Sequence, residues 1–217
     1  MFKGVAFDMD GVIIDSEKIY RKNEYRAAEH FGFPKEKVEG FCNLIAGGTR
    51  EGNTKHFHEV FETDMDYDVY REYVSEGVER HAVEHGYELK PGVTELLDFL
   101  RDNGIKTALA TSTDQDRAER FLEPLGVFSK FDRKIFGNQV KRGKPAPDIY
   151  IAAAEAIGLN AADVIGVEDS VNGVLSSHAA GLYTVMVIDL IPPTDKAAEA
   201  ADIIYEKNSI IRIKELF

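Results

Sequence analysis

Cysteine is almost absent from this chain of 217 residues, which contains only Cys42. A single cysteine cannot form an internal disulfide framework, so we expect a reducing compartment and a small buried side chain at this position rather than a nucleophile. The sequence shows no run near the roughly 18 apolar residues that a membrane-spanning helix needs. It also shows no secretory signal pattern after Met1. These absences predict a cytoplasmic protein with no membrane partner.

Positive charge is scarce as well. The chain has 26 lysines and arginines against 38 aspartates and glutamates, a formal net charge of −12. This balance disfavours a nucleic-acid partner, which would need a basic face, but a pocket of an acidic protein can still be locally positive and bind a small anion. With 44% hydrophobic and 29% charged residues, the composition is that of a globular protein. The length predicts one domain, or one domain with an insertion, and we expect a monomer.

Short apolar runs rich in β-forming residues recur along most of the chain. They lie at 5–7, 106–110, 163–167 and 183–188, with a fainter one at 203–205. Helical patterns separate the later runs, at 93–103, 115–125, 147–157 and 170–180. Alternation of strands and helices with short connections predicts an α/β fold, in which a Rossmann-like parallel sheet carries helices on both faces.

The segment 16–86 differs, because it has no convincing strand pattern. We expect four helices there, at about 17–31, 35–45, 50–62 and 66–85. A helical block that follows the first strand predicts a small four-helix domain inserted into the sheet domain. The predicted domains are therefore a Rossmann-like core made of 1–15 and 87–217, and an inserted helical domain made of 16–86.

Polar residues follow the predicted strands where each strand ends. These residues are Asp8 and Asp10, then Thr111, Ser112 and Thr113, then Glu168, Asp169 and Ser170, with Lys144 shortly before a helix. Each group alone has an ordinary explanation, as helix caps, turn residues or surface charge. In parallel sheets, however, ligands bind beyond the carboxyl ends of the strands, and all four groups converge on that edge. The combination predicts a functional site.

The residue types at this edge suit a phosphate and a metal ion. Two carboxylates that follow a buried run repel each other, which is costly without a cation. Carboxylate oxygens of Asp8 and Asp169 with the carbonyl of Asp10 form an oxygen-rich site of the kind that Mg²⁺ prefers. Lys144 offers a positive charge for a phosphate, and Thr111 offers a hydroxyl donor.

Such a site can transfer a phosphoryl group. One carboxylate can act as the nucleophile and form an aspartyl-phosphate, while a second protonates the leaving oxygen and then activates water. We interpret Asp8 as the nucleophile and Asp10 as the general acid and base. Backbone N–H groups around Gly11 and Ser112 could add an anion-binding nest.

Four motifs carry a family resemblance. FDMDGVIID, TST, GKPAPD and GVEDS occur in this order, and together they resemble the haloacid dehalogenase superfamily over essentially the whole chain. The helical insertion after the first motif is similar to the capped subfamily that includes β-phosphoglucomutase and many sugar-phosphate phosphatases. The motifs are highly specific for the superfamily and its mechanism, and weak for the substrate.

The resemblance implies a role for each matching residue of the core. Asp8 is the implied nucleophile and a Mg²⁺ ligand, and Asp10 is the implied acid and base, with its backbone carbonyl on the metal. Asp169 is a further implied Mg²⁺ ligand, and Glu168 binds the metal directly or through water. Thr111 is expected to hold the phosphoryl group, with Ser112 as a further phosphate contact, and Lys144 is expected to neutralise the group and orient Asp8.

The resemblance also implies that the helical domain is a cap that closes over the core. Its stretch 46–53 would then contact the substrate, through Gly47 and above all Arg50. For Arg50 the alternative is an ordinary solvated charge at the start of a helix. Hinges for the closure are expected at 14–16 and 86–91.

Two departures bear on the activity. β-Phosphoglucomutases have a histidine where this chain has Tyr20 and a lysine where it has Asp114, and these groups help a mutase handle a bisphosphate. The sequence therefore favours a Mg²⁺-dependent phosphatase for a small phosphorylated metabolite, with a sugar phosphate as first choice and a β-phosphoglucomutase-type mutase as the alternative. Asp10 argues against dehalogenation, which needs neither this acid nor Mg²⁺.

Two non-enzymatic functions fit the sequence less well. A phospho-receiver module shares an acidic Mg²⁺ site with Thr and Lys, but it places the acceptor Asp on a later strand and has no helical insertion. A binding protein that has lost its activity is disfavoured because the acid, Thr and Lys set is intact.

Overall fold

The computed structural model describes residues 1–45, 50–190 and 192–217. The chain divides into two compact units. The sheet unit contains Met1–Asp15 and Tyr87–Phe217, and the helical unit contains Ser16–Gly86. Among the helices of the described ranges, none has the length and apolarity to cross a membrane.

A parallel sheet forms the centre of the sheet unit. Its strands are β1 (Gly4–Phe7), β2 (Lys106–Thr111), β3 (Arg133–Phe136), β4 (Val164–Glu168), β5 (Tyr183–Val187) and β6 (Ile203–Tyr205). The order is β3-β2-β1-β4-β5-β6, so β1 lies between β2 and β4, with Phe7 beside Leu109 and Val167. All four residues of β1 are buried, as expected for a central strand covered on both faces. The predicted fold class is confirmed.

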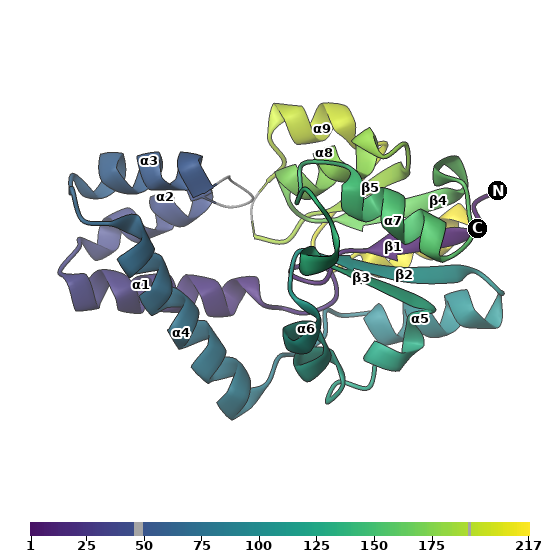
Figure 1. Ribbon diagram of the computed structural model, residues 1–217, viewed down its shortest axis with the longest axis horizontal. Coiled ribbons are helices and arrows are strands. Elements are labelled where there is room, and N and C mark those ends of the chain that lie inside the picture. Colours follow the sequence, from purple (N-terminus) through teal and green to yellow (C-terminus); the bar gives the residue numbers. More distant parts are fainter. Residues whose placement is uncertain (46–49, 191) are drawn as a thin grey trace. The chain divides into compact units, whose positions relative to one another are not determined.

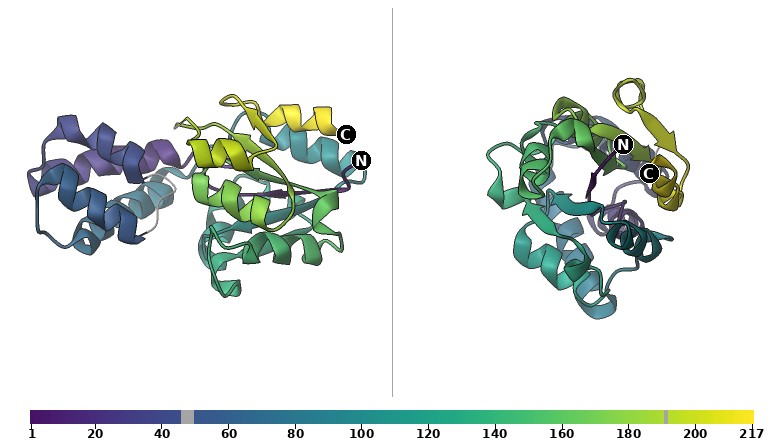
Figure 2. Two further views of the ribbon diagram at one scale, coloured as in Figure 1. Left: turned by 90° about the horizontal axis from the view of Figure 1, so that it is seen from above. Right: turned by 90° about the vertical axis from the view of Figure 1, so that its right-hand side faces the viewer.

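Helices cover both faces of this sheet. One face is covered by α7 (Asp148–Ala156), α8 (Val171–Ala179) and α9 (Asp195–Ala200). On the other face, α5 (Val93–Asp102) packs against β2 and against the 3₁₀ helix η4 (Ile210–Leu216). Figure 1 shows α7 and α8 on one side of the sheet and α5 on the other, and Figure 2 shows α5 beside the C-terminal end. The helix α6 (Gln115–Leu122) connects β2 to β3. On α5 the buried residues Val93, Leu96, Leu97 and Leu100 form one helical stripe, which explains why this segment folds against the sheet.

The strand β3 and the helix α9 were not expected from the sequence. Within the described ranges β3 is an edge strand that pairs with β2 alone, and its first residue, Arg133, is exposed. An edge strand is stabilised by pairing with a distant segment and needs no apolar run of its own. The residues of β3, RKIF at 133–136, therefore show no clear strand pattern in the sequence. The same holds for α9, whose six residues are short for a periodic signal.

The helical unit consists of α1 (Glu17–Phe31), α2 (Lys35–Ile45), α3 (Arg50–Phe61) and α4 (Tyr67–His85). α1 ends at Gly32, which has a φ of 77° and so adopts the left-handed conformation of a helix C-cap. α4 begins after Asp66, whose side chain accepts a hydrogen bond from the backbone N–H of Asp68 at 2.9 Å. The interior is largely aromatic and contains Phe41, Phe57, Phe61, Tyr67 and Tyr70.

The two places where the chain leaves and re-enters the sheet unit lie side by side. Ile14 forms an antiparallel bridge with Leu89, and the backbone N–H of Lys90 donates to Ile13 at 2.9 Å. The side chain of Lys90 is 6% exposed, and its Nζ contacts Asp15 at 3.3 Å and Asp189 at 2.5 Å. Backbone pairing and a buried ion cluster therefore fasten these two connections together.

Candidate active site

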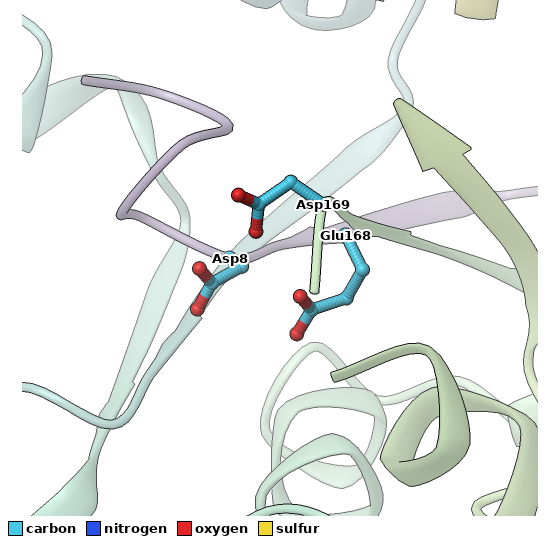
Figure 3. Close-up of side chains that lie close together, drawn as sticks. All are labelled: Asp8, Glu168 and Asp169. Atoms are coloured by element: carbon cyan, nitrogen blue, oxygen red, sulfur yellow. The ribbon is translucent and has the colours of Figure 1, made fainter. Parts of the chain in front are cut away.

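Three carboxylates gather at the carboxyl edge of the sheet. Asp8 follows β1, Glu168 is the last residue of β4, and Asp169 follows it. Because β1 and β4 are parallel neighbours, their ends bring these side chains together, and one oxygen of each lies within 4.8 Å of the others. Figure 3 shows the three carboxylates close to one another at this edge. Asp8 and Glu168 are buried and Asp169 is partly exposed.

Lys144 is the cation of this cluster. Its Nζ donates to Oδ1 of Asp8 at 2.6 Å, to Oε1 of Glu168 at 2.5 Å and to the backbone oxygen of Ala110 at 3.1 Å. The side chain is 8% exposed. A single ammonium group therefore connects the ends of β1, β2 and β4, and all three of its donor positions are used.

Charge in this cluster is unbalanced. Burial raises the pKa of Asp8 to about 7, and the negative charges of Glu168 and Asp10 add to this effect although Lys144 opposes it. For Lys144, burial lowers the pKa, but the two carboxylates outweigh burial and hold it above its usual value. The lysine thus stays protonated, and one ammonium faces several carboxylates. A bound cation would relieve this excess of negative charge.

Tyr150, on α7, holds Glu168 in place. Its hydroxyl donates to Oε1 of Glu168 at 2.7 Å, and its ring lies 5.1 Å from Nζ of Lys144. Ser170 adds a longer hydrogen bond to Oε2 of Glu168 at 3.4 Å and also caps α8 through the N–H of Gly173 at 3.1 Å. Sequence reasoning missed Tyr150. The available signal was a tyrosine at a buried helix position next to the lysine motif, since a buried tyrosine hydroxyl needs a polar partner.

The loop after β2 orients two further groups. Thr113 donates from Oγ1 to Oδ2 of Asp10 at 3.2 Å, and its backbone N–H donates to Oγ1 of Thr111 at 3.0 Å. Thr111 therefore uses an acceptor position of its hydroxyl in this turn and keeps its O–H donor for another partner. Thr111 is fully buried and Ser112 is exposed. The sequence placed Thr113 at this edge without giving it a role, and its contact with Asp10 supplies one.

Two glycines let the backbone approach the carboxylates closely. Gly11 has a φ of +74°, and a Cβ there would lie 2.0 Å from Oδ2 of Asp169. On α8, a Cβ on Gly173 would lie 1.9 Å from the carboxyl carbon of Glu168. No other residue type fits either position without moving a carboxylate.

The donor set fits a divalent metal ion. Hard cations such as Mg²⁺ prefer oxygen ligands, and Asp8, Glu168 and Asp169 offer three carboxylates within the reach of one ion. The structure thus brings together the predicted metal ligands of the strand ends and the predicted phosphate-binding Lys144.

The sequence also predicts substrate contacts in the helical unit, at Arg50 and Gly47. Arg50 is the first residue of α3, and its side chain is exposed and forms an ion pair with Asp68. Gly47 lies outside the described residues. A substrate role for either residue stays a prediction.

Comparison with known proteins identifies the family. The family model of the haloacid dehalogenase-like hydrolases matches residues 2–181. "Phosphorylated carbohydrates phosphatase" of Thermotoga maritima is 36% identical over 180 residues, which cover 83% of this chain and 82% of that protein. "Hexitol phosphatase A" of Escherichia coli is 32% identical over 188 residues, covering 85% of this chain and 82% of the relative.

A mutase and a solved structure also match. "Beta-phosphoglucomutase" of Bacillus subtilis is 28% identical over 199 residues, covering 85% of this chain and 83% of that protein. A crystal structure of a haloacid dehalogenase-like protein of unknown function from Agrobacterium tumefaciens has a TM-score of 0.84. It is 22% identical and covers 100% of this chain and 97% of its own, a likeness in fold.

The chain therefore belongs to the haloacid dehalogenase-like hydrolase family. The resemblance seen in the four motifs is confirmed. The prediction of an enzyme, a phosphoric monoester hydrolase of this family, is confirmed by the family match together with relatives that carry phosphatase names.

Proposed function

We propose that the protein is a Mg²⁺-dependent phosphatase that hydrolyses a small phosphomonoester through an aspartyl-phosphate on Asp8. The observation that carries this proposal is Lys144, which donates to both Asp8 and Glu168 within a cluster of three carboxylates. Such a cluster combines a nucleophile, a cation for the phosphoryl oxygens and a set of metal ligands. Phosphoryl transfer needs these parts held in position and little else.

The proposed metal ligands are the carboxylates of Asp8, Glu168 and Asp169, with the backbone carbonyl of Asp10. Oε1 of Glu168 also accepts hydrogen bonds from Lys144 and Tyr150. Glu168 would therefore contact the metal either directly or through a water molecule. Mg²⁺ would neutralise charge on the phosphoryl oxygens and offset the repulsion among the carboxylates.

In the first proposed step, a carboxylate oxygen of Asp8 attacks the phosphorus and the bond to the leaving oxygen breaks. The carboxyl of Asp10, oriented by Thr113, gives its proton to that oxygen. Thr111 donates its hydroxyl to a phosphoryl oxygen, with Ser112 beside it, while Lys144 orients Asp8 and balances charge. In the second step, Asp10 accepts a proton from water, the water oxygen attacks the phosphorus, and inorganic phosphate leaves Asp8.

For the substrate we propose a sugar phosphate or a similar phosphorylated metabolite. Relatives named for phosphorylated carbohydrates and hexitols support this choice. The helical unit would serve as the cap that contacts the leaving group, through Arg50 and Gly47 among others. Closure after binding would protect the aspartyl-phosphate from side reactions.

A mutase of the β-phosphoglucomutase type is the second candidate, supported by the Bacillus subtilis relative. Tyr20 and Asp114 favour the phosphatase, because they replace the histidine and lysine that a mutase uses.

Phosphate release tests the proposal and separates the two candidates. Wild type and Asp8→Asn would be assayed on phosphorylated sugars, nucleotides and small acids, with Mg²⁺ or EDTA. We expect release that requires Mg²⁺ and is lost in Asp8→Asn. β-Glucose 1-phosphate with a bisphosphate primer is the discriminating arm, since glucose 6-phosphate formed with little free phosphate would establish the mutase. Release that is unaffected by both EDTA and Asp8→Asn would refute the mechanism.

A further inference from the structure

The ammonium group of Lys90 lies at the centre of a buried ion cluster that has no part in the chemistry described so far. Its Nζ contacts Oδ1 of Asp189 at 2.5 Å and Oδ1 of Asp15 at 3.3 Å. Oδ1 of Asp189 has a second, more exposed partner in Lys207, at 3.2 Å. The cluster thus joins three segments of the sheet unit: the end of the stretch that follows β1, the stretch before α5 and the stretch after β5.

Stability alone does not explain this cluster. Desolvation offsets much of the attraction within a buried ion pair, and apolar side chains of similar volume often stabilise a protein equally well or better. Among the residues that the structure describes, none donates to Oδ2 of Asp189, which is buried, and an unsatisfied acceptor adds a further cost. What such a cluster does provide is geometry, because its directional contacts fix the joined segments relative to one another.

Asp15 ends a short turn that begins at Asp10, the proposed general acid. The backbone N–H of Gly11 donates to the carbonyl of Ile14 at 3.0 Å, and Ile14 forms a parallel bridge with Asp10. The N–H of Ile14 donates in turn to the carbonyl of Met9 at 3.0 Å. These bonds make the turn a single body, so a contact that holds Asp15 also holds the backbone of Asp10.

Lys90 also contacts this turn directly. Its backbone N–H donates to the carbonyl of Ile13 at 2.9 Å. With Gly11 and Val12 it lines a cavity of about 10 Å³, which is room for about one water molecule, so the turn has little space in which to shift. Because Gly11 lies against the carboxylate of Asp169, a shift would also reach a proposed metal ligand.

We propose that Lys90 is a positioning residue for proton transfer: through Asp15 it fixes the turn that carries Asp10, and Asp189 holds Lys90 in place. The carboxyl of Asp10 has its own contact with Thr113 at 3.2 Å, and that contact depends on a backbone held in register. A displacement of about 1 Å can lower a rate by about 100-fold. This inference rests on the proposed function, in which Asp10 protonates the leaving oxygen.

The test compares substrates that differ in their need for a proton donor. The alcohol of an alkyl phosphate leaves poorly without a proton, whereas p-nitrophenolate is a stable anion and leaves without one. Because kcat/KM covers the steps up to release of the leaving group, it reports this difference before water attacks the aspartyl-phosphate. Glucose 6-phosphate, sorbitol 6-phosphate and glycerol 1-phosphate would be assayed with Mg²⁺ beside p-nitrophenyl phosphate.

The variants separate positioning from stability. Lys90→Met removes the ammonium, and Lys90→Met with Asp189→Leu also removes the buried carboxylate that the single change leaves behind. Asp15→Asn is the mildest change, because Asp15 is only partly buried and the amide keeps the shape of its side chain. Leu100→Ala is the control for lost stability, since it opens a cavity in the last turn of α5 and removes no contact of the turn.

We expect both Lys90 variants to lower kcat/KM on the alkyl phosphate that wild type hydrolyses best by about 10- to 100-fold, and on p-nitrophenyl phosphate by less than about threefold. The double variant should regain stability in urea denaturation but not this activity, because the contact between positions 90 and 15 is still missing. Asp15→Asn should act in the same direction with a smaller effect. Leu100→Ala should lower stability and leave the ratio between the substrates unchanged.

Hydrogen exchange measured by mass spectrometry gives a readout that does not depend on turnover. The amides of 10–15 should exchange faster than in wild type, relative to those of β4, in both Lys90 variants and not in Leu100→Ala.

Several outcomes would overturn the inference. Equal losses on all substrates, or recovery of kcat/KM together with stability in the double variant, would assign Lys90 a purely structural role. Unchanged exchange at 10–15 in the Lys90 variants would show that Lys90 does not fix the turn. Each of these results leaves the proposed phosphatase standing, whereas a wild type that releases phosphate from none of the substrates would refute the proposed function itself.

Discussion

Gly173 lies directly against the carboxylate of Glu168, with no room for a side chain between them. A Cβ on this glycine would lie 1.9 Å from the carboxyl carbon and 2.1 Å from Oε1, the atom that contacts both Lys144 and Tyr150. The first turn of α8 is thus the surface that fixes one of the three carboxylates. A backbone position without a functional group therefore controls the geometry of the site.

Gly173→Ala should displace Glu168 and disturb the whole cluster. We expect kcat to fall at least about tenfold, with a higher Mg²⁺ concentration needed for half-maximal activity, because the support of a metal ligand typically contributes 10- to 100-fold. Steady-state kinetics across a Mg²⁺ titration would measure both effects. Gly40→Ala is the control: it lies in α2 with open space where its Cβ would be, and it should stabilise the protein by roughly 0.5–1 kcal/mol. Normal activity and normal Mg²⁺ dependence in Gly173→Ala would contradict the predicted role.

Thr113→Val should weaken catalysis without weakening substrate binding. The change removes the hydroxyl that donates to Oδ2 of Asp10 while keeping the shape of the side chain. We expect kcat to fall by about 10- to 150-fold, since one hydrogen bond to a carboxylate contributes about 1.5–3 kcal/mol, and we expect KM to stay within about twofold. Thr113→Ser retains the hydroxyl and should restore most of the activity. A rise in KM at constant kcat would show that Thr113 acts on binding instead.

Glu24 should make the stability of the protein depend on pH. Burial raises the pKa of Glu24 from its ordinary value of 4.5 to about 7 in the folded protein, although a hydrogen bond with Tyr70 opposes this, so between these pH values the folded chain holds a proton that the unfolded chain has lost. The unfolding free energy therefore decreases as pH rises from about 4.5 to 7, by about 3 kcal/mol in total, and stays reduced above pH 7.

Glu24→Gln removes this dependence. The variant should exceed wild type by up to about 3 kcal/mol in unfolding free energy at pH 8 and by close to zero at pH 4.5, measured by urea denaturation. Glu36→Gln changes an exposed acid of α2 and should show no such trend. The same difference between wild type and Glu24→Gln at both pH values would disprove the prediction.

Lys90→Met should destabilise the sheet unit strongly. It removes the buried ammonium that contacts Asp15 and Asp189, and it leaves Asp189, itself 3% exposed at its side chain, with the exposed Lys207 at 3.2 Å as its remaining ion-pair partner. Breaking a buried pair costs about 3–5 kcal/mol, and Lys207 should keep the loss near the lower end of this range, whereas replacing both partners by apolar residues is often close to neutral. The double variant Lys90→Met with Asp189→Leu should therefore be more stable than Lys90→Met in urea denaturation. Additive losses would indicate that the two side chains are not coupled.

Local patterns were sufficient for much of the fold. The four helices of the helical unit begin and end within one residue of the predicted positions, because Gly32, the acidic cap at Asp66 and the apolar spacing all act within a few residues. The convergence of Asp8, Thr111 and Glu168 could also be predicted, since parallel strands end at one edge.

What the sequence could not reveal depends on distant partners. β3 forms because β2 pairs with it, and its two charged residues leave no apolar pattern from which a strand could be predicted. Tyr150 looks like any core aromatic until its hydroxyl is found against Glu168. Glu24 is surrounded in sequence by Lys22, Asn23, Tyr25 and Arg26, so it looks like part of a solvated helix face, and only the packing of α1 reveals its burial.

The discontinuity of the sheet unit has a consequence for how the protein is made. β1 is synthesised before both strands that flank it, because those strands lie beyond the helical unit in the sequence, and Lys144 is 136 positions from the Asp8 that it contacts. Contacts so far apart in sequence form slowly, because a long loop must close before they contribute. During synthesis on the ribosome, β1 and Asp8 would therefore have no sheet partners while the helical unit folds. The earliest-made residues of the site are the last to acquire their surroundings, which makes β1 the segment most in need of protection from aggregation before the chain is complete.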